Sequence, residues 1–129
     1  MPLIKINMVK GKALNEKRKV AEAVHKALVT SIKVPEESRN IRINEYEKDD
    51  YILSPGNSEE YVLIEISLYE GRTIDAKRSL YKNIIDNLGI LGVKSEDIYI
   101  ILHEEPLENW GIRGGQCASD VNLGFKVNV

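Results

Sequence analysis

Pro2 is the residue whose position has the clearest chemical potential, because it becomes the N-terminal residue once Met1 is removed. It would then carry a free secondary amine, and an ordinary α-amino group has a pKa of about 7.7–8.0. Apolar surroundings or a nearby cation lower that pKa, and such a group exchanges protons efficiently near neutral pH. We therefore predict that Pro2 is a proton-transfer catalyst. The alternative is an ordinary proline at the first residue of a strand.

Arg72 is the second candidate, since it lies where a strand-like run passes into a helix-like run. A guanidinium group at such a place holds a carboxylate through two parallel hydrogen bonds. It would also lower the pKa of Pro2 if the two residues were close. The alternative is a solvated arginine, although a helix N-terminus is an unfavourable place for a cation. Together the two residues predict proton transfer on a small substrate that carries a carboxylate.

The elements that must position these residues form an internal repeat. Leu3-Ile4-Lys5-Ile6 recurs as Leu63-Ile64-Glu65-Ile66, and Gly11-Lys12 recurs as Gly71-Arg72. Apolar periodicity predicts strand, helix and strand in each copy, at residues 3–9, 15–32 and 39–45 and again at 61–69, 73–88 and 97–103. Asn15 and Thr73 are expected to cap the helices. A turn or hairpin is expected at 109–115 and a last strand at 121–129, broken at Gly124.

A strand–helix–strand unit returns its second strand parallel to the first. Two such units predict an α/β (α+β) fold with a four-stranded mixed sheet and both helices on one face. We expect a single domain over 1–129, with repeats at about 2–46 and 60–104 and a C-terminal hairpin and strand at about 109–129. No third helix is predicted to cover the other sheet face. Four strand residues therefore suggest a symmetric homo-oligomer: Ile4, Ile6, Ile64 and Ile66.

Composition excludes several classes of function. The 18 basic and 20 acidic residues are interspersed without a basic stripe, so nucleic acid is not an expected partner. The apolar runs are too short for a membrane span. Cys117 is the only cysteine, so no disulfide forms within the chain and a cytoplasmic location is expected. Two histidines and one cysteine at unrelated spacings predict no metal site, and no cofactor is expected.

Taken together, these features resemble the tautomerase superfamily of 4-oxalocrotonate tautomerase-like proteins. The resemblance lies in Pro2 before a first strand, the repeated unit, and Glu70-Gly71-Arg72-Thr73 at the start of the second helix. The chain is most similar to a fused branch of comparable length, related to malonate semialdehyde decarboxylase and cis-3-chloroacrylic acid dehalogenase. It shares with one part of that branch Glu104-Glu105-Pro106 and Trp110-Gly111-Ile112-Arg113-Gly114. The resemblance implies a tautomerase (MIF-like) fold and a homotrimer with the active site near Pro2.

The same resemblance implies substrate-binding roles for several residues. An arginine that matches Arg72 binds the substrate carboxylate in the family, and a histidine that matches His25 helps to bind substrate. A lone histidine on the shoulder of a helix is as often structural. The remaining expected substrate-binding residues are those near the pocket wall or at a matching family position: Trp110, Ser38, Tyr69 and Arg113.

This chain also departs from the characterised members of the branch. Ser38 stands where the decarboxylase has an aspartate, and Glu70 replaces a second arginine. Ile112 and Ile101 stand where the dehalogenase has a glutamate and a tyrosine. The groups that remain suffice for keto–enol tautomerisation, so we predict an isomerase for a 2-hydroxy-dienoate or a phenylenolpyruvate-like acid. The alternatives are a decarboxylase or hydratase of a 3-oxo or unsaturated acid with a cationic Pro2, and a non-enzymatic ferredoxin-like module that binds a small acid.

Overall fold

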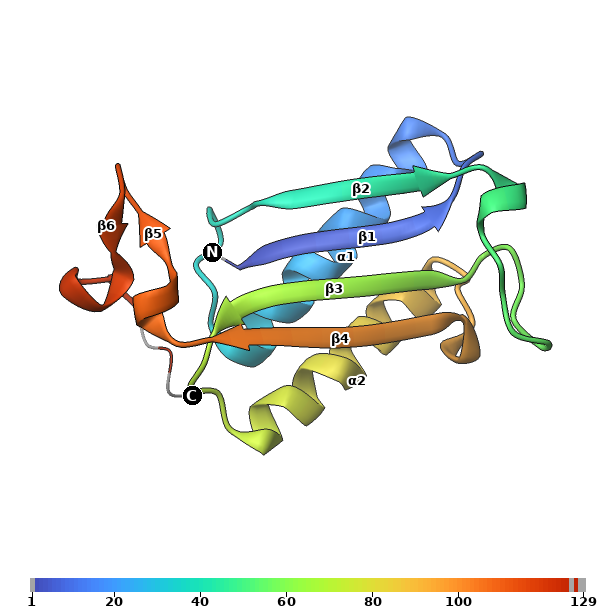
Figure 1. The fold of residues 1–129 in the computed structure, drawn as a ribbon. Helices are drawn as coiled ribbons and strands as arrows, with labels where there is room; N and C mark the ends of the chain where they lie inside the picture. Colours follow the sequence, from blue (N-terminus) through green and yellow to red (C-terminus); the bar gives the residue numbers. More distant parts are fainter. Residues whose placement is uncertain (1, 126, 128–129) are drawn as a thin grey trace.

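The computed structural model describes residues 2–125 and 127. It has two layers, a four-stranded sheet and a pair of helices that cross one of its faces (Figure 1). The sheet has the order β2-β1-β3-β4, from strands β1 (Leu3–Val9), β2 (Ile41–Tyr46), β3 (Val62–Tyr69) and β4 (Ile98–Glu105). The helices are α1 (Leu14–Ile32) and α2 (Ile74–Ile90). The predicted sheet with two helices on one face is confirmed.

Each repeat supplies one parallel pair of strands, β1 with β2 and β3 with β4. The two pairs meet through β1 and β3, which run antiparallel with Leu3 opposite Ser67 and Ile6 opposite Ile64. The start of β1 therefore lies beside the end of β3. This antiparallel join brings Pro2 and the chain that follows Tyr69 to the same end of the sheet (Figure 1).

The core lies between the sheet and the helices. Successive strand side chains point to opposite faces, and the isoleucines of β1 and β3 point toward the helix layer, where they are fully or almost fully buried. They pack with Val24 and Leu28 of α1 and with Ile84 and Leu88 of α2. The prediction that Ile4, Ile6, Ile64 and Ile66 mark an uncovered face was wrong. Both connecting helices return over the face that these side chains occupy.

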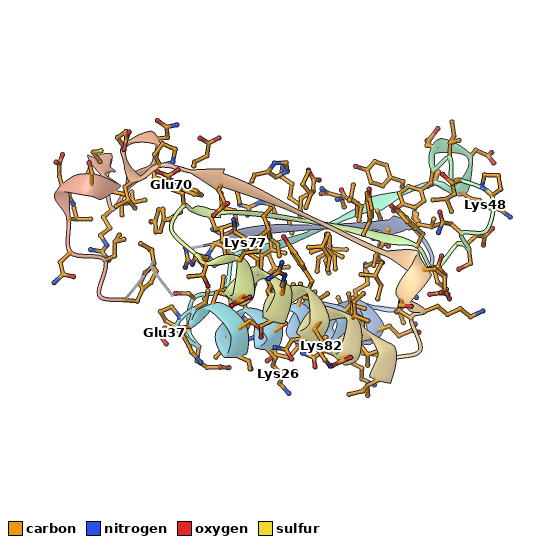
Figure 2. All side chains as sticks on the ribbon, turned by 90° about the horizontal axis from the view of Figure 1, so that it is seen from below. Lys26, Glu37, Lys48, Glu70, Lys77 and Lys82 are labelled. Atoms are coloured by element: carbon orange, nitrogen blue, oxygen red, sulfur yellow. The ribbon has the colours of Figure 1, made fainter. Side chains whose placement is uncertain are left out.

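No helix among the described residues covers the opposite face of the sheet (Figure 2). This face mixes polar and apolar side chains. Asn7 donates to the carbonyl oxygen of Leu63 at 2.9 Å and to the Glu65 carboxylate at 3.0 Å, and His103 lies 3.3 Å from the other Glu65 oxygen. Tyr99, 64% exposed, lies on the same face. In a single chain this face of the sheet is therefore not covered by a helix of the described residues.

The two helices begin in different ways. Thr73 caps α2 as predicted, because its Oγ1 accepts a hydrogen bond from the backbone N–H of Ala76 at 3.1 Å. The predicted Asn15 cap was wrong, since α1 is capped by Ala13 without a side-chain hydrogen bond. Asn15 lies inside the first turn and accepts instead from the N–H of Glu16. Neither α-helix is long and apolar enough to cross a membrane, as judged over the described residues.

Short elements complete the chain. The expected hairpin forms from β5 (Gly111–Ile112) and β6 (Gln116–Cys117). Four 3-10 turns lie at Lys48–Asp50, Ser95–Asp97, Leu107–Asn109 and Ala118–Asp120. The strand predicted at 121–129 is absent from its described part, residues 121–125 and 127; residues 126, 128 and 129 lie outside the described residues. Arg113 donates to the carbonyl oxygens of Asn122 and Leu123, and Gly124 has φ 80°, which interrupts the extended backbone that begins at Val121.

Asp97 anchors the segment before β3 to the start of β4. It is 2% exposed, and its carboxylate accepts from the N–H and hydroxyl of Ser58 at 2.9 and 2.6 Å and from Asn57 at 3.5 Å. These hydrogen bonds, chiefly that of the Ser58 hydroxyl, lower the pKa of Asp97. The resulting stabilisation is complete above the unfolded pKa of about 3.9. It is lost as the pH falls through the lower folded value.

We expect Asp97→Asn to lower the free energy of unfolding at pH 7 by about 2 kcal/mol, because hydrogen bonds to a charged group are lost. Urea denaturation at one fixed protein concentration measures the change. Asp49→Asn is the matched control, since Asp49 is exposed. The variant should also lose less stability than the wild type as the pH falls below about 4. Equal urea midpoints for Asp97→Asn and the control would contradict this role.

Candidate active site

One end of the sheet gathers most of the residues that the sequence singles out (Figure 1). Pro2 lies just before β1, one step beyond the Leu3–Ser67 pair and therefore level with Leu68. The hairpin β5–β6 follows the end of β4 at this same end. Pro2 is buried. A free amine at this position would therefore be partly desolvated.

Arg72 lies beyond the end of β3, after Gly71, whose φ of 128° lets the chain turn sharply there. The Arg72 side chain is almost entirely buried, with 7% of the residue exposed. Its Nη1 donates to the carbonyl oxygen of Tyr69 at 2.9 Å, whereas its buried Nε has no partner among the described residues. Burial lowers the pKa of Arg72, and the nearby Glu104 and Tyr69 act in the opposite direction. A buried, unpaired donor on a cation is costly unless an anion binds to it.

Arg72 lines a hollow of about 570 Å³, here called the Arg72 hollow. Its lining also includes Glu70, Lys77, Glu104, Leu107 and Glu108. The Lys77 ammonium donates to the Glu104 carboxylate at 2.5 Å. Glu70 lies near the hairpin, Lys77 lies closer to the middle of the molecule, and Lys48 marks the other end (Figure 2).

A second hollow of about 520 Å³ lies against Tyr69 and is here called the Tyr69 hollow. Its lining includes Pro35, Glu37, Ser38, Ile112, Arg113 and Phe125. The Tyr69 ring meets Trp110 edge to face at 4.9 Å and stacks on Phe125 at 6.3 Å between centroids. Burial raises the pKa of Tyr69, so its hydroxyl stays neutral at physiological pH. The Tyr69 and Phe125 rings give this hollow an aromatic surface, and Trp110 packs on Tyr69 outside its lining.

Trp110 ties the hairpin to the sheet, and Arg113 ties it to the segment that follows β6. Trp110 Nε1 donates to the carbonyl oxygen of Glu105 at 3.3 Å, at the end of β4. Arg113 donates from Nη1 to the carbonyl oxygen of Asn122 at 2.9 Å and from Nη2 to that of Leu123 at 3.4 Å. Arg113 thus lies at the Tyr69 hollow with its guanidinium group already bound to backbone.

His25 and Ser38 are placed differently from each other. His25 is 1% exposed, and its Nε2 donates to the carbonyl oxygen of Glu36 at 2.8 Å. It lines neither hollow, and in this chain it holds the loop between α1 and β2 in place. Ser38, on that loop, lines the Tyr69 hollow, and its N–H donates to the carbonyl oxygen of Pro35 at 2.9 Å. His25 therefore contacts the loop that carries Ser38 and does not line either hollow.

Sequence reasoning did not select Lys77, Glu104 or Phe125 as site residues. Lys77 lies one turn after Thr73 on the first part of α2, and only this helical spacing could have pointed to it. Glu104 lies on β4, paired in register with Leu68. Its closeness to Lys77 depends on strand pairing and helix packing, which a local pattern does not reveal.

The repeat creates an equivalent position at the opposite end of the sheet. Lys12 matches Arg72, and Gly11, with φ 137°, matches Gly71. At that end the Lys12 ammonium is 2.5 Å from the Glu60 carboxylate. Val62, which matches Pro2, lies inside the chain and has no terminal amine. Of these two matched ends, only the Pro2 end combines a potential terminal amine with a cation that has an unpartnered buried N–H.

Comparison with known proteins identifies the family. A family model described as "Tautomerase enzyme" matches residues 38–113, and a second model with the same description matches residues 2–59. The chain belongs to the tautomerase family. These matches span both repeats and include Pro2 and Arg72.

Individual relatives extend over nearly the whole chain. "Probable tautomerase YusQ" of Bacillus subtilis (strain 168) is 28% identical over 123 residues, covering 91% of this chain and 97% of that protein. The structure of FG41 malonate semialdehyde decarboxylase inhibited by 3-bromopropiolate has a TM-score of 0.81 at 28% identity, covering 89% of this chain and 92% of the other. A fused 4-OT symmetric trimer has a TM-score of 0.81 at 24% identity, covering 91% and 96%. This last similarity shows a shared fold alone.

Proposed function

We propose that this protein is a tautomerase that interconverts the enol and keto forms of a small carboxylic acid. In this proposal Pro2 is the base and acid, and Arg72 binds the substrate carboxylate. The observation that carries it is the buried Nε of Arg72, which has no described partner and lies at the end of the sheet where Pro2 precedes β1. Membership of the tautomerase family supports the reaction class.

The hydrogen bond that Arg72 already makes indicates how the carboxylate would bind. Nη1 is used by the Tyr69 carbonyl oxygen, which leaves the edge formed by Nε and Nη2 for the ligand. Two parallel N–H groups on this edge match the two oxygens of a carboxylate. Binding would therefore give the orphaned Nε a partner and fix the orientation of the substrate.

Proton transfer then needs only the amine. Removal of Met1 leaves Pro2 as a secondary amine, kept neutral by burial and by the positive charge of Arg72. The neutral amine takes the proton from the enol hydroxyl group. The O–H electron pair forms the carbonyl bond, the carbon–carbon double-bond electrons shift along the conjugated system, and a carbon takes the proton from the protonated amine. The amine ends neutral, and no proton or electron is gained or lost.

The proposal includes assembly and location. We propose a homotrimer, supported by the fused 4-OT relative that is described as a trimer and by the open sheet face, which a second copy would cover. We place the protein in the cytoplasm, where the free thiol of Cys117 would stay reduced.

The direct test combines intact mass, covalent labelling and turnover. We expect the purified protein to lack Met1, to convert phenylenolpyruvate from enol to keto form in an ultraviolet assay, and to gain one adduct from 3-bromopropiolate. Peptide mapping should locate that adduct on Pro2, because the neutral amine is a nucleophile. Retention of Met1, or an intact fold with no Pro2 adduct and no turnover, would favour a module that only binds small acids.

Decarboxylation of a 3-oxo acid is the second candidate, favoured by the 28% identity to FG41 malonate semialdehyde decarboxylase. That reaction would use a cationic Pro2 and would release carbon dioxide. Gas release from malonate semialdehyde at a rate above that of enol–keto conversion would make decarboxylation the main activity.

A further inference from the structure

The cations of the Arg72 hollow differ in whether they are free to bind a ligand. Lys77 is paired with Glu104 at 2.5 Å, and both side chains are about three-quarters buried. Arg72 forms no ion pair with any described residue, although Glu104 is close enough to act on its charge. One cation in this hollow is therefore engaged, and only Arg72 is available to an incoming carboxylate.

The acidic residues of the same hollow outnumber the basic ones. Glu70, Glu104 and Glu108 line it against Arg72 and Lys77. A first substrate carboxylate is matched by Arg72. A second carboxylate would find no unpaired cation in this lining and would meet Glu70 and Glu108, which repel it at short range. The charge balance thus favours an acid with one carboxylate.

The Tyr69 hollow suits an uncharged tail, and it is lined by the residue whose carbonyl oxygen accepts a hydrogen bond from Arg72. Tyr69, Phe125 and Ile112 contribute ring and aliphatic surface to it. Its two charged residues, Arg113 and Glu37, have opposite signs, and Arg113 is already bound to two carbonyl oxygens. A flat apolar group gains buried contact with the rings here, whereas a carboxylate gains no free cation.

We infer that the substrate is an enol acid with a single carboxylate and an aromatic or apolar tail, and that Glu104 and Glu70 exclude acids with two carboxylates. This inference rests on the proposed function, because it places the substrate carboxylate on Arg72. Glu104 acts in two ways, since it adds a negative charge and also occupies Lys77. Glu70 adds a negative charge alone, because no described residue forms an ion pair with it.

The first test measures binding of non-reacting acids, so it does not depend on turnover. Isothermal titration calorimetry would compare 3-phenylpropionate, with one carboxylate, and adipate, a chain of similar length with two. We expect 3-phenylpropionate to bind at least about tenfold more tightly, because the second adipate carboxylate meets unpaired acidic groups. The same order is expected in kcat/KM for phenylenolpyruvate against 2-hydroxymuconate.

Three variants test whether Glu104 and Glu70 cause the selectivity against acids with two carboxylates. In Glu104→Gln, Lys77 becomes free, so adipate affinity should rise about tenfold or more and the rise for 3-phenylpropionate should be smaller. In Glu104→Gln/Lys77→Met that gain in adipate affinity should be lost. Glu70→Gln, at an exposed position where folding is not at risk, should raise adipate affinity a few-fold. Glu96→Gln, an exposed carboxylate before β4 outside both hollows, is the charge-matched control and should change neither affinity.

Each outcome separates the inference from the proposed function. Equal or tighter binding of adipate by the wild-type protein, or an adipate affinity that Glu104→Gln leaves unchanged, would overturn the inference. Turnover of 2-hydroxymuconate that depends on Pro2 and exceeds that of phenylenolpyruvate would overturn it while leaving the tautomerase proposal intact. If 3-phenylpropionate is preferred in binding but turnover of both enols is independent of Pro2, the selectivity inference holds and the proposed mechanism fails.

Discussion

Pro2→Ala is expected to lower kcat/KM for phenylenolpyruvate about 10²-fold, at the lower end of what a general base contributes. Alanine also allows removal of Met1, so the variant keeps a terminal amine in place of the secondary amine. It loses the ring that fixes the direction of that amine at the start of β1. Steady-state rates of enol–keto conversion measure the effect, with intact mass to confirm that Met1 is absent.

A bulkier second residue provides the complementary variant. Pro2→Leu should retain Met1, which moves the terminal amine one residue away from the site. Enol–keto conversion should then fall to the rate without enzyme, a larger loss than in Pro2→Ala. Turnover in Pro2→Leu equal to that of the wild type, with Met1 present, would exclude the amine from the mechanism.

The pH dependence of the wild-type protein distinguishes the two candidate reactions by its sign. A base must be neutral, so kcat/KM for tautomerisation should be lost as the pH falls through the pKa of Pro2 in the free enzyme. Decarboxylation with a cationic Pro2 would show the reverse, a loss as the pH rises through the same value. The pKa of the N-terminal amine can be measured separately from the pH dependence of its labelling rate. A kcat/KM for tautomerisation that does not change with pH across that pKa would contradict the proposal.

Arg72→Ala is expected to lower kcat/KM at least about 10²-fold, mainly through a higher KM. The reason is the loss of two charge-assisted hydrogen bonds to the substrate carboxylate, each worth about 1.5–3 kcal/mol. Arg72→Lys should recover only part of the loss, because an ammonium group keeps the charge without the paired N–H edge. Arg78→Ala is the control, since Arg78 is an exposed arginine near the start of α2 that pairs with Asp75.

Stability gives Arg72 a second readout. Removing a buried guanidinium group that lacks a partner for Nε should change the free energy of unfolding by less than about 1 kcal/mol, because the loss of packing is offset by the loss of its desolvation penalty. The rise in Tm that 3-phenylpropionate produces in the wild-type protein should disappear in Arg72→Ala. An undiminished ligand-dependent rise would place the carboxylate elsewhere.

Local features of the sequence were enough to predict most of the secondary structure. The period-two and helical patterns located every main strand and both α-helices to within about three residues. Thr73 capped α2 because a side-chain oxygen next to the first turn is a local signal. Asn15 has a side-chain oxygen of the same kind, yet the predicted Asn15 cap was wrong because α1 already begins at Leu14. Which residue caps a helix depends on where packing places the first turn.

Contacts between residues distant in sequence determine which face of the sheet is buried and whether the C-terminal segment forms a strand. The isoleucines of β1 and β3 alternate in the same way whichever face the helices cover, and only the connections of the folded chain bury them against α1 and α2. The segment 121–125 alternates like a strand, yet Arg113 takes two of its carbonyl oxygens. In both cases the outcome depended on groups distant in sequence, which a local pattern cannot rank.

In the candidate site, too, some features follow from the sequence and others only from the folded chain. The available residue types can be read without a structure: a proline that follows Met1, an arginine after a strand-like run, and an aromatic residue at the expected hairpin. Their arrangement depends on the folded chain, because antiparallel pairing of β1 with β3 places Pro2 at the same end of the sheet as Arg72 and at the opposite end from Lys12. In the folded chain His25 is buried in the core, and Lys77 forms an ion pair with Glu104. Residue types are fixed by covalent chemistry, whereas burial and ion pairing exist only once strands and helices have packed.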